Sequence, residues 1–126
     1  MKAIVCTKYG APEVLKLQEV DKPIPKNNEV LIKIYATAVT ASDCIIRGFK
    51  IPVVHWFPKG LIMNTMMRIA VGFKKPRNPI LGLVLSGEIE SIGSAIKKFK
   101  KGDQVYAFTG YSFGAYAEYT CMKEVD

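Results

Sequence analysis

Hydrophobic and polar residues alternate along several short stretches of this chain, with the period of two that is typical of half-buried β-strands. The clearest stretch is Ile80–Gly93, where an apolar start leads into alternating glutamate and isoleucine. Ile89 and Ile92 fall out of step by one residue, which predicts a β-bulge. Gly82 and Gly87 interrupt the stretch, and a glycine inside a strand pattern marks a bend or a close backbone contact. We therefore expect a strand that curls around a small barrel.

Further segments carry strand signals. They are Met1–Lys8, Val14–Val20, Glu29–Val39, Gln104–Thr109 and Ala115–Met122. The first two predict a hairpin with one solvent-exposed face, and the prolines of Asp21–Asn28 predict a loop after it. Turn residues at such short intervals are the pattern of a small antiparallel barrel, so the chain is predicted to be mainly β.

Two segments have helical features instead. Cys44–Gly48 predicts a short helix closed by Gly48, with Ser42 or Asp43 as its side-chain cap. Leu61–Val71 places leucine, isoleucine and methionine at helical spacing. A methionine-rich face of this kind favours packing in a core or at an interface, although methionines also suit adaptable apolar pockets.

The composition fits one domain. A chain of 126 residues builds a real core but is short for a complete dinucleotide-dependent enzyme. Cys6, Cys44 and Cys121 are widely spaced, without a C-x-x-C pair, so we expect neither a disulfide framework nor a zinc knuckle. No signal segment follows Met1, and no apolar run reaches the roughly 18 residues that span a bilayer. These features favour a cytoplasmic protein.

The net charge of +7 comes from 18 basic and 11 acidic residues. Such an excess attracts nucleic acid, anionic membranes or phosphorylated cofactors. The basic residues cluster at Lys74–Arg77 and Lys97–Lys101, each beside a turn signal, and solvated loops are the simpler interpretation. A single-stranded nucleic acid site would need several aromatics among these charges, and Phe99 alone lies within them. We expect no nucleic acid and no membrane partner.

Nucleotide-binding fingerprints are missing. The sequence has no G-x-G-x-x-G, and in the only partial match to G-x-x-x-x-G-K-[ST], Gly82 and Gly87 are followed by Glu88, whose carboxylate would repel phosphate. His55 is the single histidine, without a second ligand nearby in sequence. We interpret it as an ordinary loop residue rather than a metal ligand or general base.

Three blocks in a fixed order carry a family resemblance. Ile80–Gly93, Phe99–Val105 and Gly114–Tyr119 resemble the N-terminal, GroES-like domain of the medium-chain dehydrogenase/reductase superfamily. The matching blocks run from Met1 to about Met122 and look most like the zinc-free quinone oxidoreductase branch. The resemblance implies a partly open GroES-like antiparallel β-barrel with one or two short helices, covering residues 1–126, and a Rossmann cofactor domain that this chain does not contain.

The ligand positions of zinc-containing relatives hold other residues here. By the resemblance, Thr40, Leu83 and Val84 stand where such relatives have their cysteine, histidine and glutamate ligands. Leucine and valine cannot donate to a metal, and a catalytic zinc site needs three protein ligands. The four-cysteine structural lobe is absent as well. We therefore expect no zinc.

The resemblance also implies a zinc-free hydride-transfer site. Thr40 and Ser42 match positions that face the nicotinamide and relay protons, so both are predicted as catalytic and cofactor-binding residues. Asp43 is expected to hold the loop. The predicted substrate pocket comprises Ile45, Trp56, Met66 and Tyr116.

These expectations combine into one function and two alternatives. We expect the substrate-side domain of a zinc-independent oxidoreductase that uses NADP(H) to reduce quinones, enones or related carbonyls, and that forms a homodimer at full length. The isolated chain is expected to fold but to be inactive, because half of the cofactor cleft is missing. The alternatives are a stand-alone co-chaperonin-like binding module and a zinc-type alcohol dehydrogenase.

Overall fold

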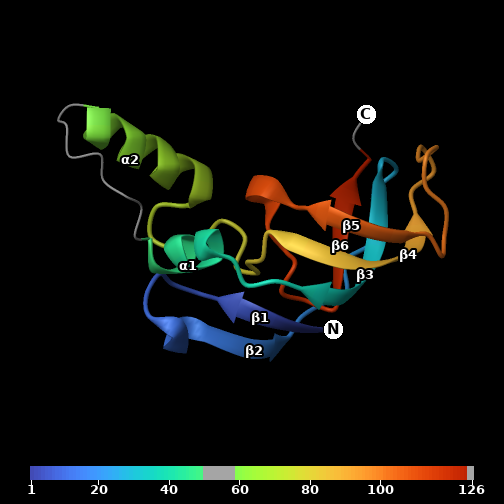
Figure 1. The fold of residues 1–126 in the computed structure, drawn as a ribbon, viewed down its shortest axis with the longest axis horizontal. Coiled ribbons are helices and arrows are strands. Elements are labelled where there is room, and N and C mark those ends of the chain that lie inside the picture. Colours follow the sequence, from blue (N-terminus) through green and yellow to red (C-terminus); the bar gives the residue numbers. More distant parts are fainter. Residues whose placement is uncertain (50–58, 125–126) are drawn as a thin grey trace.

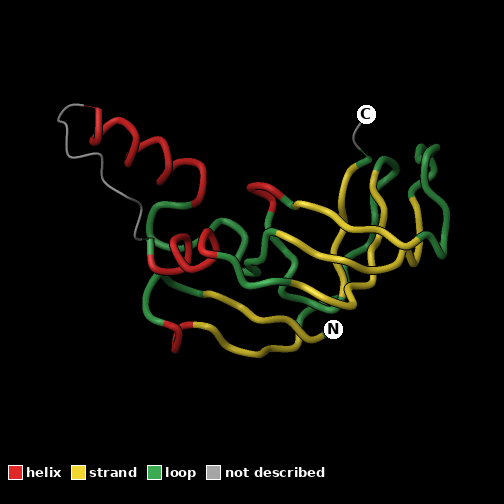
Figure 2. The backbone as a smooth tube through the Cα atoms, in the orientation of Figure 1, coloured by secondary structure: helices red, strands yellow, loops and turns green. Residues whose placement is uncertain are grey.

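The structure is a computed structural model that describes residues 1–49 and 59–124. The strands are β1 (Lys2–Cys6), β2 (Leu15–Glu19), β3 (Glu29–Thr37), β4 (Val84–Ile92), β5 (Gln104–Phe108) and β6 (Tyr119–Lys123). The helices are α1 (Ala41–Gly48) and α2 (Lys59–Val71), with 3-10 turns at Pro12–Val14 and Gly110–Ser112. The mainly β prediction with two short helices is confirmed (Figure 2).

Two antiparallel sheets make up the body of the domain (Figure 1). Strands β1 and β2 form the predicted hairpin, and the larger sheet has the order β5-β4-β3-β6. Isolated bridges from Ala3 to Ala117 and from Val5 to Ile80 tie the hairpin to the rest. Within the described residues the two sheets do not close into a barrel, which fits the partly open architecture expected from the resemblance.

Strand β4 bears the bulge that its sequence predicts. Ile32 pairs with Ile89, whereas the neighbouring Leu31 pairs with Ser91, so Glu90 is the extra residue. At Gly87 the strands come so close that an added Cβ would lie 2.0 Å from the carbonyl oxygen of Lys33. A side chain there would collide with backbone, and this explains why the β4 pattern contains a glycine.

Two hydrophobic clusters stabilise the domain. The first lies on the larger sheet and comprises Val30, Ile32, Leu85, Ile89, Ile96 and Ala115. The second joins the hairpin, the end of α2 and the segment before β4, and comprises Cys6, Val71, Leu81, Leu83 and Phe113. The two clusters hold α1 and the loop after β5 close to the start of β4, where the candidate site lies.

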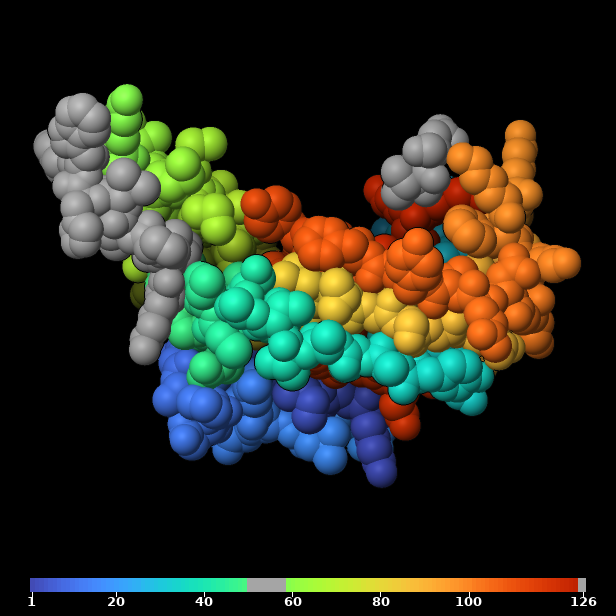
Figure 3. Space-filling view, in the orientation of Figure 1, coloured from blue at the N-terminus to red at the C-terminus, as the bar shows by residue number. Residues whose placement is uncertain are grey.

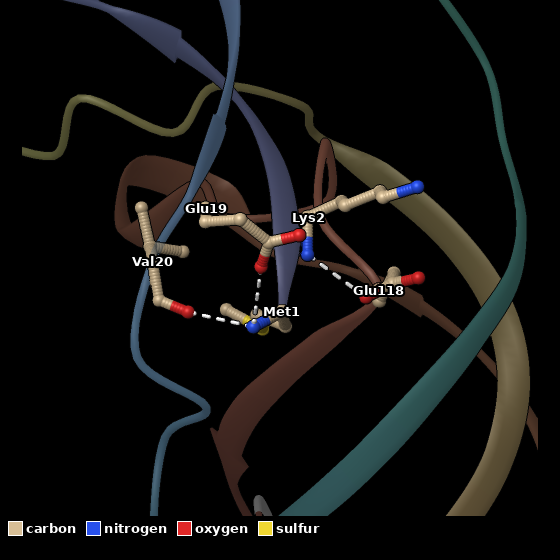
Figure 4. Close-up of polar contacts among 5 residues, drawn as sticks. All are labelled: Met1, Lys2, Glu19, Val20 and Glu118. Carbon is tan, nitrogen blue, oxygen red and sulfur yellow. Dashed lines mark hydrogen bonds and ion pairs between the residues drawn. The ribbon is translucent and has the colours of Figure 1, made fainter.

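The block around Glu118 fixes the start of the chain. The backbone N–H of Lys2 donates to Glu118 Oε2 at 2.8 Å, and the amino group of Met1 donates to the Val20 carbonyl at 2.7 Å (Figure 4). The same amino group lies 3.3 Å from a carboxylate oxygen of Glu19. Glu118 therefore serves the fold, by joining β1 to the segment that enters β6.

Helix α2 differs from its predicted packing. Gly60, Met67 and Val71 lie on the side that contacts the domain, whereas Leu61, Met66 and their apolar neighbours face outward. The helix stands out at one end of the molecule (Figure 1). Of the two predicted kinds of packing, packing of this apolar face in the core is therefore not found in this chain, and packing at an interface stays a prediction. In the described part, no helix has the length and apolar character needed to cross a membrane.

Candidate active site

A capping box at the end of β3 holds helix α1. The Thr40 side chain accepts a hydrogen bond from the backbone N–H of Asp43 at 3.3 Å, and its hydroxyl donates to Asp43 Oδ2 at 2.7 Å. The same carboxylate oxygen accepts from the backbone N–H of Thr40 at 2.9 Å. Two of the free amide groups at the helix start are satisfied in this way.

The predicted ends of this helix need correction. Thr40 is the cap, and not Ser42 or Asp43, and the helix begins at Ala41 rather than Cys44. At the other end Phe49 adopts the left-handed conformation, with φ 48°, where the sequence predicted Gly48 as the stop. Asp43 is 3% exposed and holds the loop, as expected.

Ser42 differs from Thr40 because its hydroxyl is exposed and makes no hydrogen bond within the described part of the chain. It lies on the rim of a cavity of about 300 Å³ between α1, α2 and the loop after β5. The lining is almost wholly apolar and consists of Ile45, Ile46, Met67, Leu83, Phe108, Gly110, Tyr111 and Phe113, with Ser42. An apolar cavity with the hydroxyls of Ser42 and Tyr111 on its lining suits a flat, mostly apolar molecule that carries a hydrogen-bond acceptor.

Tyr116 lies behind α1, next to Asp43. Its ring lies against Gly82, where an added Cβ would meet Tyr116 Cδ1 at 2.7 Å. The hydroxyl of Tyr116 is buried without a hydrogen-bond partner, and so is Asp43 Oδ1. Burial, and after it the negative charge of Asp43, raises the pKa of Tyr116 well above its ordinary value. The phenol therefore stays protonated over the whole physiological range.

The structure brings some predicted site residues together and not others. Ser42 and Ile45 line the same cavity, and Thr40 caps the helix that carries both. Met66 points elsewhere, and its neighbour Met67 lines the cavity instead. Tyr116 borders a separate groove beside the β1–β2 hairpin. Trp56 and His55 lie outside the described residues.

Sequence reasoning missed the aromatic wall of the cavity. Phe108 ends β5, Tyr111 belongs to the 3-10 turn and Phe113 is buried after it. The available signal was an aromatic residue at nearly every second position of a glycine-bounded turn. Of these three side chains only Phe113, at 3% exposed, packs in the interior, whereas Phe108 and Tyr111 line the cavity while 68% and 70% exposed.

The expected zinc-ligand positions serve other roles here. Thr40 is engaged by Asp43, Leu83 lines the cavity and Val84 begins β4. Within residues 1–49 and 59–124, no three histidine, cysteine, aspartate or glutamate side chains gather closely enough to hold a metal ion.

Comparison with known proteins places the chain in a family. Residues 26–126 match the family of the alcohol dehydrogenase GroES-like domain. The chain is 38% identical over 126 residues to quinone oxidoreductase from Lama guanicoe, which covers 98% of this chain and 32% of that protein. It is 32% identical to the chloroplastic NADPH-dependent alkenal/one oxidoreductase of Arabidopsis thaliana, over 98% of this chain and 29% of that protein.

The fold gives the same result. The quinone oxidoreductase of Coxiella burnetii superposes with a TM-score of 0.69 at 30% identity, covering 98% of this chain and 34% of that one. The chain thus spans about a third of the length of the relatives that it matches. From its sequence, its two sheets and its capped helix, the chain belongs to the alcohol dehydrogenase GroES-like domain family of the medium-chain dehydrogenase/reductase superfamily.

Proposed function

We propose that this chain is the substrate-side domain of a zinc-independent oxidoreductase that uses NADP(H) to reduce quinones, enones or related carbonyls. The observation that carries the proposal is the 38% identity to a quinone oxidoreductase over 98% of this chain. A second relative, at 32% identity, is named for NADPH-dependent reduction of alkenals and alkenones, which supports both the cofactor and the substrate class. The activity, cofactor and partners of the whole protein are part of this proposal.

The cavity at Ser42 fits the proposed chemistry. Its apolar lining favours an apolar quinone or enone over a charged substrate. The free hydroxyl of Ser42 is the one side-chain polar group on the lining apart from Tyr111, and it is positioned to donate a hydrogen bond to a carbonyl oxygen. A bound nicotinamide cofactor would supply the hydride.

Thr40 takes a different role from Ser42. Its hydroxyl both donates to and accepts from Asp43, so we assign Thr40 as a positioning residue that fixes the first turn of α1 and thereby the place of Ser42. Its predicted direct part in proton relay stays a prediction. Ser42 and Ile45 are the residues of this chain that would contact the nicotinamide end of the cofactor or the substrate.

The residues present do not fit a catalytic zinc ion. Leu83 and Val84 offer no ligand atom, and the Thr40 hydroxyl already binds Asp43. We therefore assign no step to a metal. We also propose that the whole protein is a cytoplasmic homodimer, and that this chain alone lacks activity because the cofactor-binding half lies outside it.

Turnover by the whole gene product tests the proposal. We expect NADPH oxidation with a quinone and an enone, no reaction with a primary alcohol and NADP⁺, and no NADPH oxidation by the 126-residue chain. Ser42→Ala should lower kcat at least tenfold, because one hydrogen bond to developing oxyanion charge is lost. Activity restricted to alcohols, or full activity of Ser42→Ala, would refute the assignment of substrate class or of Ser42 respectively.

A further inference from the structure

The net positive charge of this chain arises in one segment. Residues 44–87 contain seven lysine and arginine residues and no aspartate or glutamate. The remaining 11 basic residues are balanced by the 11 acidic residues, so the entire net charge of +7 comes from this segment. Lys59 begins α2, and Lys74, Lys75 and Arg77 follow it in an exposed bend.

Helix α2, in the middle of this segment, exposes an apolar face. Met66 and Ile69 are each 63% exposed, and Leu61, Ile62 and Met63 are exposed as well. Phe73, just after the helix, is 61% exposed. Met67 and Val71, four residues apart on the opposite side, pack in the second hydrophobic cluster, and the buried Gly60 lies seven residues before Met67. We call this exposed surface, with its flanking lysines, the α2 face.

An apolar strip beside the exposed cations of Lys74, Lys75 and Arg77 is the surface chemistry of a peripheral membrane helix. The 13 residues of α2 span about 20 Å, too short to cross a hydrocarbon core of about 30 Å but suited to lying along its surface. Figure 3 shows α2 as a lobe that projects at one end of the molecule. Against the expectation from sequence that there is no membrane partner, we propose that the α2 face docks on a bilayer that contains anionic phospholipids.

Other occupants fit these observations less well. Two copies paired through this face would bring the same cations together, and like charges in a symmetric interface repel. Single-stranded nucleic acid is bound by stacking on several aromatic side chains, whereas Phe73 is the one aromatic residue of the α2 face. An anionic bilayer offers negatively charged headgroups to the cations and an acyl-chain region to the aliphatic side chains.

Vesicle sedimentation tests the proposal. The chain should sediment with vesicles of phosphatidylcholine and phosphatidylglycerol, release at high salt, and stay in solution with phosphatidylcholine alone. Lys74→Gln/Lys75→Gln should weaken binding about 20-fold, because each lysine near an anionic surface contributes about fivefold. The matched control, Lys100→Gln/Lys101→Gln, removes the same charge from the other basic cluster and should leave binding within about twofold of the unmodified chain.

The apolar part of the face needs its own variant. Ile62→Ser/Met66→Ser/Ile69→Ser should reduce binding more than tenfold while far-UV circular dichroism stays unchanged, because these side chains are exposed. Leu17→Ser, at an exposed position on β2, is the control and should have no effect.

Several results would overturn the proposal. These are no binding to anionic vesicles, equal loss in both lysine pairs, or a dimer in size-exclusion chromatography that the triple variant dissociates. If the gene encodes a longer chain, that product must bind the same vesicles. Binding by the 126-residue chain alone would mean that the rest of the protein covers the α2 face, and would refute docking on lipid.

Discussion

The capping box at α1 yields a sharp test of which hydroxyl serves the fold and which serves chemistry. Thr40→Ala removes the acceptor for the Asp43 amide and the donor to Asp43 Oδ2. Loss of a threonine cap costs about 1 kcal/mol, and a hydrogen bond to a charged group contributes about 1.5 kcal/mol or more. Because the two effects share one side chain, we expect a loss of about 2 kcal/mol in the free energy of unfolding.

The matched variants separate the two roles. Thr40→Ser keeps the hydroxyl and should stay within about 0.5 kcal/mol of the unmodified chain. Ser42→Ala removes an exposed hydroxyl without a partner, so its free energy of unfolding should also change by less than about 0.5 kcal/mol.

Urea unfolding of the 126-residue chain, followed by far-UV circular dichroism, measures these differences. In thermal unfolding the same 2 kcal/mol corresponds to a lower Tm by about 7 °C for a domain of this size. A Thr40→Ala variant as stable as the unmodified chain, or a Ser42→Ala variant that is equally destabilised, would refute the assignment of Thr40 as the structural hydroxyl.

Three further predictions follow from single positions. Gly82 and Gly102 both have positive φ, of 99° and 92°, but of these two only Gly82 has atoms that an added Cβ would strike. In urea unfolding, Gly82→Ala should therefore lower the free energy of unfolding by about 3 kcal/mol and Gly102→Ala by about 1 kcal/mol. The folded-state pKa of Tyr116 is raised, so the unfolded chain loses this proton at a lower pH than the folded chain does. The free energy of unfolding should therefore fall as pH rises above about 10, and Tyr116→Phe should show a shallower fall in the same pH series. Cys44 is exposed whereas Cys6 is buried with a raised thiol pKa, so a thiol reagent should modify Cys44 quickly and Cys6 only on unfolding.

Each of these has a clear contrary outcome. Equal costs at the two glycines would mean that backbone strain, and not collision with the Tyr116 ring, dominates. Parallel pH curves for Tyr116→Phe and the unmodified chain would show that this phenol does not titrate abnormally. A fast-reacting thiol that persists in Cys44→Ser would show that another cysteine is accessible.

Local patterns predicted what depends on local geometry. The bulge in β4 followed from the offset of Ile89 and Ile92, because side chains alternate strictly along a strand. The cap of α1 was misassigned because threonine, serine and aspartate are all good caps. The spacing of Thr40 and Asp43 was nevertheless the available signal, since an acidic residue three positions after a threonine reaches back to it.

The sequence pattern does not predict which side chains meet across distant parts of the chain. Helical spacing shows that α2 has apolar residues on several sides, but only the fold shows that Met67 turns toward the domain while Met66 does not. The proximity of Tyr116 to Asp43 joins segments more than 70 residues apart in the chain, and no periodicity encodes it. The aromatic wall at Phe108 and Tyr111 likewise depends on how the turn after β5 folds back over α1.

Hydride transfer to an apolar carbonyl or quinone without a metal is the step on which the proposed function depends. Metal content and NADPH-dependent quinone reduction are determined together on the whole gene product, before and after treatment with a chelator. We expect substoichiometric zinc and unchanged turnover after chelation. Stoichiometric zinc, with activity that chelation abolishes and zinc restores, would contradict it and would mean that ligands outside Thr40, Leu83 and Val84 form a metal site.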